Sequence, residues 1–290
     1  MAGNAAVIAV CGHEAAYGAA LEGHPGPDVD IVPNGRALFR AVAARLRRGE
    51  RVVVVPMTLG REPGLVADAA RTLRAVPEAG RGAVLLAEPF GTAQHLVAWL
   101  RAASGRVPAD SALLLAAPSG DPFEDAELHR VAALVRRYGS HDLVEVAFDG
   151  GDPAPADGVR RCALLGAERV ALLPASFAAV GPGGAGPVPV ADAGPLVPGP
   201  ALRRVLDERV ADAHRRWDEQ GDDGITTGLA AADHHGHAHT HPPGEGHGHS
   251  HGQEHGQAHG HPHEHGPGTG HRHHHPPSAA GADLGIRSIA

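Results

Sequence analysis

Short apolar runs alternate with amphipathic segments along the first 215 residues of the chain. The runs are rich in Val, Leu and Ala and predict strands at about 6–11, 51–56, 83–87, 112–116, 143–147, 169–173 and 188–191. Apolar residues at helical spacing predict helices at about 36–48, 64–77, 91–104, 123–138, 156–165 and 199–216. In the first of these, Leu38, Val42 and Leu46 form the apolar stripe, and Gly49 ends the helix. Strands that alternate with helices predict an α/β fold with parallel sheets.

The pattern occurs twice. Residues 51–56 (RVVVVP) are matched by 169–174 (RVALLP), and residues 7–13 have a counterpart in 112–117. We therefore expect two similar halves, 1–105 and 106–217, each with a central parallel sheet flanked by helices. Ligands of open α/β sheets bind beyond the carboxyl ends of the strands. The sequence thus predicts a cleft between the strand ends of the two halves.

Composition changes at about residue 218, where a third part, 218–290, begins. Of the 23 histidines, six lie before residue 220 and seventeen lie between His234 and His275. Residues 218–232 predict a linker. Residues 233–277 contain ten glycines, several prolines and no Phe, Trp or Tyr, so they predict a disordered tail.

The tail also predicts metal binding. Its His-Gly-His, His-Ala-His and His-Pro-His spacings place several imidazoles within reach of one ion, and neutral imidazole suits Zn, Cu, Ni and Co. The tail could serve as a metal reservoir or delivery arm, or it could be a low-complexity expansion without a selected role. The candidate ligands are His235, His237, His239, His241, His247, His249, His251, His259, His261, His263 and His265.

The remaining composition narrows the class of protein. A formal net charge of −8 argues against nucleic-acid binding. Cys11 and Cys162 lie in apolar contexts and predict buried side chains, not a disulfide. No apolar stretch has the length of a membrane span, and the first residues lack a basic secretory segment. We expect a cytoplasmic protein without a membrane partner, and its oligomeric state stays open.

The richest candidate chemistry follows the first strand, where an apolar run stops at Gly12 and His13 and Glu14 follow. A histidine at a strand end can act as a base near neutral pH and as a metal ligand, or can be a satisfied core residue. After the second strand, Arg61 could pair with an acidic substrate, and Asp68 follows in the next helix. Carboxylates also favour the first turn of a helix for structural reasons alone.

Other motifs are fewer. Residues 118–122 (PSGDP) predict a turn that caps the helix from 123. The chain has no glycine-rich phosphate loop, no Gly-x-Ser-x-Gly and no Cys-x-x-Cys. We therefore expect no organic cofactor.

Together these features resemble the CbiX-type sirohydrochlorin chelatases, which are class II tetrapyrrole chelatases. The resemblance rests on Gly12-His13, on Pro56 followed by Asp68, and on the Pro89-Phe90-Gly91 opening of a helix. It covers most of residues 5–216 and is most typical at 145–148 and 166–174, and some members carry histidine-rich tails. It implies insertion of cobalt or iron, with nickel a further possibility, into a sirohydrochlorin-like tetrapyrrole in cobalamin or sirohaem synthesis.

The resemblance implies that His13 is the first active-site histidine and that Asp68 matches the family pattern. The family's second histidine falls at Gly64, and Ala117 stands where the second half would place one. His13 must then find its partners among nearby carboxylates or in the tail. Two hypotheses follow: a chelatase with the tail as metal reservoir, or a non-catalytic metal store or delivery protein on a chelatase scaffold.

Overall fold

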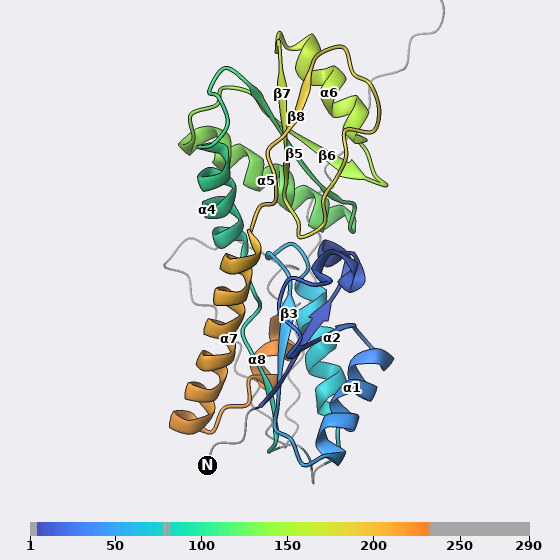
Figure 1. Ribbon diagram of the computed structural model, residues 1–290, viewed down its shortest axis with the longest axis vertical. Coiled ribbons are helices and arrows are strands. Elements are labelled where there is room, and N and C mark those ends of the chain that lie inside the picture. The colour runs from blue at the N-terminus through green and yellow to red at the C-terminus, as the bar shows by residue number, and fades with distance from the viewer. Residues whose placement is uncertain (1–4, 78–79, 81, 232–290) are drawn as a thin grey trace, which may run out of the picture. The chain divides into compact units, whose positions relative to one another are not determined.

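The described part of the chain, residues 5–77, 80 and 82–231 of a computed structural model, has an α/β fold (Figure 1). It contains two four-stranded sheets in which every pair of neighbouring strands is parallel. The strand order is β2-β1-β3-β4 in the first sheet and β6-β5-β7-β8 in the second. The two halves therefore have the same topology, as the repeated sequence pattern predicts.

The elements follow one another in a βαβ sequence in both halves. The strands are β1 (Ala6–Cys11), β2 (Val29–Pro33), β3 (Val52–Met57), β4 (Val84–Leu86), β5 (Ala112–Pro118), β6 (Val144–Asp149), β7 (Val170–Pro174) and β8 (Val190–Asp192). The helices are η1 (His13–Leu21), α1 (Arg36–Arg47), α2 (Pro63–Arg74), α4 (Ala93–Ser104), α5 (Pro122–Tyr138), α6 (Pro155–Leu164), α7 (Gly199–Gln220) and α8 (Ile225–Leu229).

The strand register confirms the internal repeat. In the first sheet Val10 lies opposite Pro56, and in the second sheet Ala116 lies opposite Pro174. The two prolines that end the matched sequence runs therefore occupy the same place in the two sheets. Their neighbours β1 and β5 are central strands, buried on both faces, which is why they read as continuous apolar runs.

The structure contains three elements that the sequence pattern did not predict. The edge strand β2 has the sequence VDIVP, too short and too interrupted by polar residues to stand out. The 3₁₀ helix η1 begins at His13 and contains non-helical backbone. Helix α8 lies within the predicted linker 218–232, and its Ile225 is buried in the core beside α2, so this segment is partly folded. The predicted disordered tail, 233–277, lies outside the described residues.

Each sheet is covered by helices on both faces. Helices α1, α2 and α8 pack on one face of the first sheet, and α6 packs on one face of the second. The opposite faces share one core with α4, α5 and α7. Helix α4, which follows the first sheet in sequence, packs against α5 and β7, whereas α7, which follows the second sheet, packs against β3 and β4 (Figure 1). The repeats thus exchange their last helices.

Two further expectations can be compared with the structure. Cys11 and Cys162 are free and buried, as predicted. Among residues 5–231, apart from the few that are not described, no helix combines the length and the apolar character needed to cross a membrane.

Candidate functional site

His13 lies at the carboxyl edge of the first sheet, directly after β1 and Gly12. Glu62, the residue before α2, extends its carboxylate to this turn. The carboxylate accepts hydrogen bonds from the backbone N–H groups of His13 (3.2 Å) and Glu14 (3.4 Å). A Cβ atom at position 12 would lie 1.7 Å from Glu62 Oε1, so this close approach requires glycine.

The imidazole of His13 has a carboxylate at each ring nitrogen. Its Nδ1 lies 3.3 Å from Glu62 Oε1, and its Nε2 lies 3.8 Å from Glu124 Oε2. Glu124 belongs to the first turn of α5, in the second half of the chain. The Nε2 atom is buried and has no hydrogen-bond partner in the structure. We call His13, Glu62 and Glu124 the His13 cluster; it joins the strand ends of the two halves.

A second glycine makes room for this cluster. A Cβ at Gly120 would lie 2.2 Å from Glu124 Oε2 and 3.1 Å from His13 Nε2. Gly120 follows the end of β5 as Gly12 follows the end of β1. Both strand ends therefore lack a side chain where the carboxylates approach the imidazole.

The charges of the cluster are strongly coupled. Burial lowers the pKa of His13, but the hydrogen bond to Glu62 and the negative charges of Glu62, Glu124 and Glu14 outweigh it, so that its pKa is raised. Burial raises the pKa of Glu124, against the opposing effects of the Asp121 N–H and of His13. The site therefore favours a positive charge at the imidazole, either a proton or a bound cation.

Glu14 is fully buried beneath the same loop. Its Oε2 accepts hydrogen bonds from the Thr58 hydroxyl and from the Leu59 N–H at 2.9 Å, whereas its Oε1 has no partner in the structure. Burial raises the pKa of Glu14, and the charge of Arg61 and the two donors only partly offset this. Glu14 thus lies beside the cluster, but its carboxylate holds the loop after β3.

Arg61, which the sequence suggests could pair with an acidic substrate, is buried and paired within the protein. Its side chain has no exposed surface, and its guanidinium bonds Asp125 Oδ1 at 3.1 Å. It also donates to the backbone oxygens of Glu124 (3.3 Å) and Pro118 (3.4 Å) and lies over the ring of Phe148. Arg61 therefore connects the loop after β3 to the start of α5.

Asp68 does not join the His13 cluster. It lies on the exposed face of α2, where its carboxylate pairs with Arg71 one turn later. The predicted turn at 118–122 is confirmed. Asp121 caps α5 by accepting from the N–H groups of Phe123 and Glu124, and Glu124 accepts in return from the Asp121 N–H at 2.9 Å.

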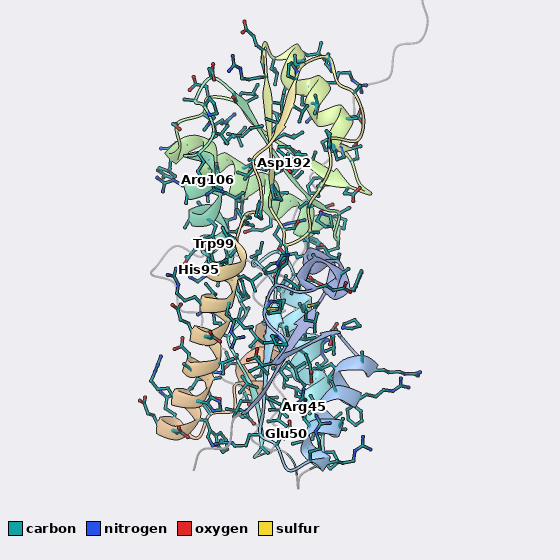
Figure 2. The ribbon with its side chains drawn as sticks, viewed as in Figure 1. Arg45, Glu50, His95, Trp99, Arg106 and Asp192 are labelled. Carbon is teal, nitrogen blue, oxygen red and sulfur yellow. The ribbon has the colours of Figure 1, made fainter. Side chains whose placement is uncertain are left out.

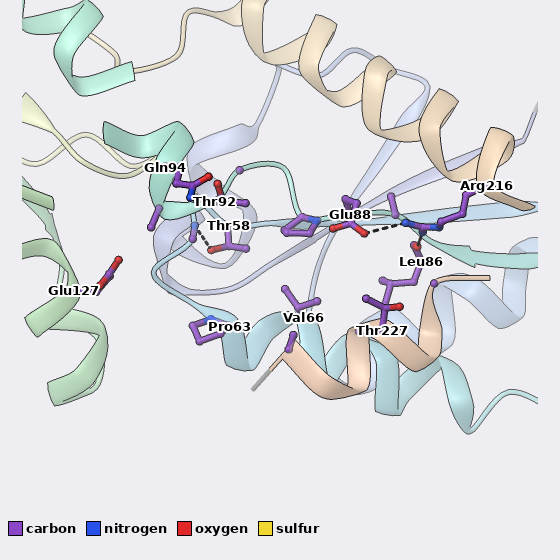
Figure 3. A pocket seen from close by; sticks show the side chains of 18 of the residues that line it. Thr58, Pro63, Val66, Leu86, Glu88, Thr92, Gln94, Glu127, Arg216 and Thr227 are labelled. Carbon is purple, nitrogen blue, oxygen red and sulfur yellow. Dashed lines mark hydrogen bonds and ion pairs between the residues drawn. The ribbon is translucent and has the colours of Figure 1, made fainter. Parts of the chain in front are cut away.

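A cavity of about 770 Å³ lies beside this region (Figure 3). The loop that binds Glu14 forms part of its wall through Thr58 and Gly60. Arg216 lies at another wall, where it donates to Glu88 (2.9 Å) and to the Leu86 carbonyl (2.7 Å) (Figure 3). The remaining lining is mainly apolar and includes Pro63, Val66, Ala87, Pro89, Gly228 and Ala231. The volume is within the range of ligand pockets.

Candidate metal ligands differ between the described part of the chain and the histidine-rich tail. Within the part that the structure describes, no group of three or more His, Cys, Asp or Glu side chains is arranged to hold a metal ion. The candidate ligands of the tail, from His235 to His265, lie outside the described residues.

Comparison with known proteins does not name a family. No protein-family model matches this chain, and no curated protein matches it. The fold and the arrangement of the side chains at the strand ends are therefore the basis for a functional proposal.

Glu62 and Glu124 are the members of the cluster that the sequence pattern does not assign. Glu62 reads as a residue at the start of a helix, which is also its place in the structure. For Glu124, a signal was present: the Asp121-x-x-Glu124 capping box fixes its side chain at the first turn of α5. Its approach to His13 depends on the packing of two halves and has no local signature.

Proposed function

We propose that the protein is a cytoplasmic chelatase that inserts a divalent metal ion into a sirohydrochlorin-like tetrapyrrole. Cobalt is the first candidate, and iron or nickel are variants because imidazole and carboxylate ligands discriminate little among these ions. In this proposal the metal ion is a substrate, the two similar α/β halves form a chelatase-like fold, and the product serves cobalamin or sirohaem synthesis.

The observation that carries the proposal is the His13 cluster at the facing strand ends of the two halves. Insertion of M²⁺ into a metal-free tetrapyrrole releases two protons from the ring nitrogens. A site for this reaction needs a group that attracts a cation and a group that accepts protons. The imidazole of His13 between Glu62 and Glu124 provides both kinds of group within 4 Å.

The nearby cavity supports the proposal in two ways. Its volume and mainly apolar lining suit a flat organic ligand, and its wall includes the loop bound to Glu14. Arg130 and Arg216 also line it, each paired with a glutamate of the same lining, Glu127 at 2.6 Å and Glu88 at 2.9 Å. The resemblance of the sequence to CbiX-type chelatases supplies the identity of the ring.

One observation favours the second hypothesis, a non-catalytic metal store or delivery protein. The described residues hold no three-ligand group for a stable metal site, and the family's second histidine position is Gly64. Stable metal binding would then belong to the histidine-rich tail, with its candidate ligands from His235 to His265.

Metal insertion by the full-length protein tests the proposal directly. The protein is mixed with sirohydrochlorin and Co²⁺, and the change in the absorption spectrum on insertion is followed against a protein-free control. We expect a rate well above the control, reduced by about 100-fold or more in His13→Ala, because removal of a general base typically costs this much. His24→Ala is the matched control, since His24 is exposed and lies in a loop.

The outcomes separate the two hypotheses. If the rate of metal insertion equals that of the protein-free control, the chelatase hypothesis is rejected and the hypothesis of a metal store or delivery protein remains. A catalysed rate that is equal in wild type and His13→Ala would reject the His13 cluster as the site.

A further inference from the structure

The cavity of about 770 Å³ is bounded on one side by the end of the described chain. The last described residue, Ala231, lines it together with part of α8. This end is held in place, because Ile225 is buried in the core and the Asp223 carbonyl accepts the Leu86 N–H of β4 at 2.8 Å. The chain therefore continues beyond Ala231 directly from the cavity wall.

The rest of the chain carries one short apolar run. No Val, Leu, Ile, Met, Phe, Tyr or Trp occurs between Leu229 and Leu284. Leu284, Ile286 and Ile289 then occur within six positions, in the sequence LGIRSI. Burial of such side chains is favourable, and a few apolar anchors in a polar chain are typical of peptides that dock on a folded domain. We call this run the 284–289 segment.

The cavity matches the segment in polarity and charge. Its walls are mainly apolar, and the charged side chains of its lining form two ion pairs, Glu127–Arg130 at 2.6 Å and Glu88–Arg216 at 2.9 Å. An apolar occupant can therefore displace water from the walls without breaking an ion pair. The one charged side chain of the segment, Arg287, is opposite in sign to Glu88, whose side chain stays 51% exposed.

We propose that the 284–289 segment docks in the cavity of its own chain, with its three large apolar side chains against the apolar walls. The segment starts 53 residues after Ala231 (284 − 231). A flexible chain of this length has a root-mean-square span of about 40 Å, which gives the segment an effective concentration on the order of millimolar. Weak apolar contacts are then enough for occupancy. The docked segment and a tetrapyrrole would compete for the same walls, so the segment restrains the proposed activity.

Disulfide trapping in the full-length protein tests the docking. Thr227 is exposed and lines the cavity (Figure 3), and the native Cys11 and Cys162 are buried. The reactive pair is therefore the one introduced by Thr227→Cys and Ser288→Cys. The matched control combines Thr227→Cys with Ser250→Cys, which lies in the polar tract. Both proteins are equilibrated in a glutathione redox buffer with a metal chelator, and the intramolecular disulfide is measured by mass spectrometry.

Loop closure alone favours the control pair. Its loop spans 23 residues (250 − 227) against 61 (288 − 227), which gives the control about a fourfold higher effective concentration. Docking predicts the reverse order, with the Ser288→Cys pair favoured about tenfold or more, and Ile286→Ser with Ile289→Ser should remove this preference. A Ser288→Cys pair no more stable than the control would overturn the proposal. So would a preference that survives the serine substitutions, or disulfide-linked dimers in place of monomers.

Kinetics separate the docking from the proposed function. Ile286→Ser with Ile289→Ser should lower the KM for sirohydrochlorin about fivefold, because the ring no longer competes with the segment. Ser278→Ala is the control and should leave this KM unchanged. If the disulfide forms as expected and no variant catalyses insertion, the docking stands and the chelatase is rejected. If the disulfide forms and the KM is unchanged in the serine variant, the docking stands and the ring binds outside this cavity.

Discussion

Replacing Arg61 with alanine tests whether the two halves are held together by a buried ion pair. The Arg61 side chain has no exposed surface, and Asp125 is 22% exposed. The change removes the ion pair, two hydrogen bonds to backbone oxygens and the contact with the Phe148 ring. It also leaves the two backbone oxygens, of Pro118 and Glu124, without this donor.

The expected cost follows from burial. Breaking a buried ion pair by removing one partner costs about 3–5 kcal/mol, because the other charge remains uncompensated. Asp125 is partly exposed and keeps hydrogen bonds from Ser119 Oγ and the Gly120 N–H, so we expect the lower end, about 3 kcal/mol. For a protein of this size this corresponds to a fall in Tm of about 6–12 °C.

Thermal unfolding of the full-length protein, followed by circular dichroism in the presence of a chelator, measures the effect. Arg71→Ala is the matched control, because the Arg71–Asp68 pair is more than half exposed on both sides. Such exposed pairs contribute less than about 1 kcal/mol. Equal Tm values for Arg61→Ala and Arg71→Ala would show that the buried pair does not stabilise the fold.

Three further predictions concern separate features. Gly12→Ala should displace the Glu62 carboxylate and reduce metal insertion. The loss of its charged hydrogen bonds should lower the free energy of unfolding by about 1.5–3 kcal/mol, and an unchanged midpoint of urea unfolding would contradict this. His95 accepts a hydrogen bond from the Thr92 N–H at 3.2 Å through Nδ1 (Figure 2 shows its ring beside Trp99), and burial and then Arg209 lower its pKa. Above the ordinary histidine pKa of 6.5, neutral His95 should contribute its full stabilisation to the fold. This contribution should be lost as the pH falls through the lower pKa that His95 has in the folded state. His95→Gln should therefore flatten the curve of Tm against pH in this range. Deleting residues 233–277 should remove most of the metal bound at equilibrium, measured by elemental analysis, and an equal metal content would refute the reservoir.

Much of the fold was predictable because its signals are local. Buried parallel strands read as apolar runs, and helices carry an apolar stripe that ends at residues such as Gly49. Strand β2 was not predictable in this way, since it is a short edge strand with the charged Asp30 as its second residue. Helix α8 has only five residues and owes its burial to contacts with α2 and β4, which the local sequence does not encode.

The candidate site was predictable only in part. A strand that ends in Gly-His indicates the edge of a sheet, and His13 lies there. The side chains that contact it come from 49 and 111 residues away (62 − 13 and 124 − 13), and no local pattern specifies such pairs. The position of Arg61 shows the same limit: its partner Asp125 lies 64 residues away, and the tertiary packing that buries Arg61 has no local signature.

The exchange of the last helices between the repeats ties the two sheets to each other. Because α4 packs with the second sheet and α7 with the first, the chain crosses between the two sheets twice, at 87–92 and at 193–198. The two sheets also share one hydrophobic core with α4, α5 and α7. Phe90, in the first segment, contacts Phe177 at 5.2 Å between ring centroids and accepts hydrogen bonds from Arg209 of α7.

His13 belongs to the first half and Glu124 to the second, and their facing atoms lie 3.8 Å apart. The exchanged helices hold this distance, because any shift of one sheet against the other would disturb the packing of α4 or α7.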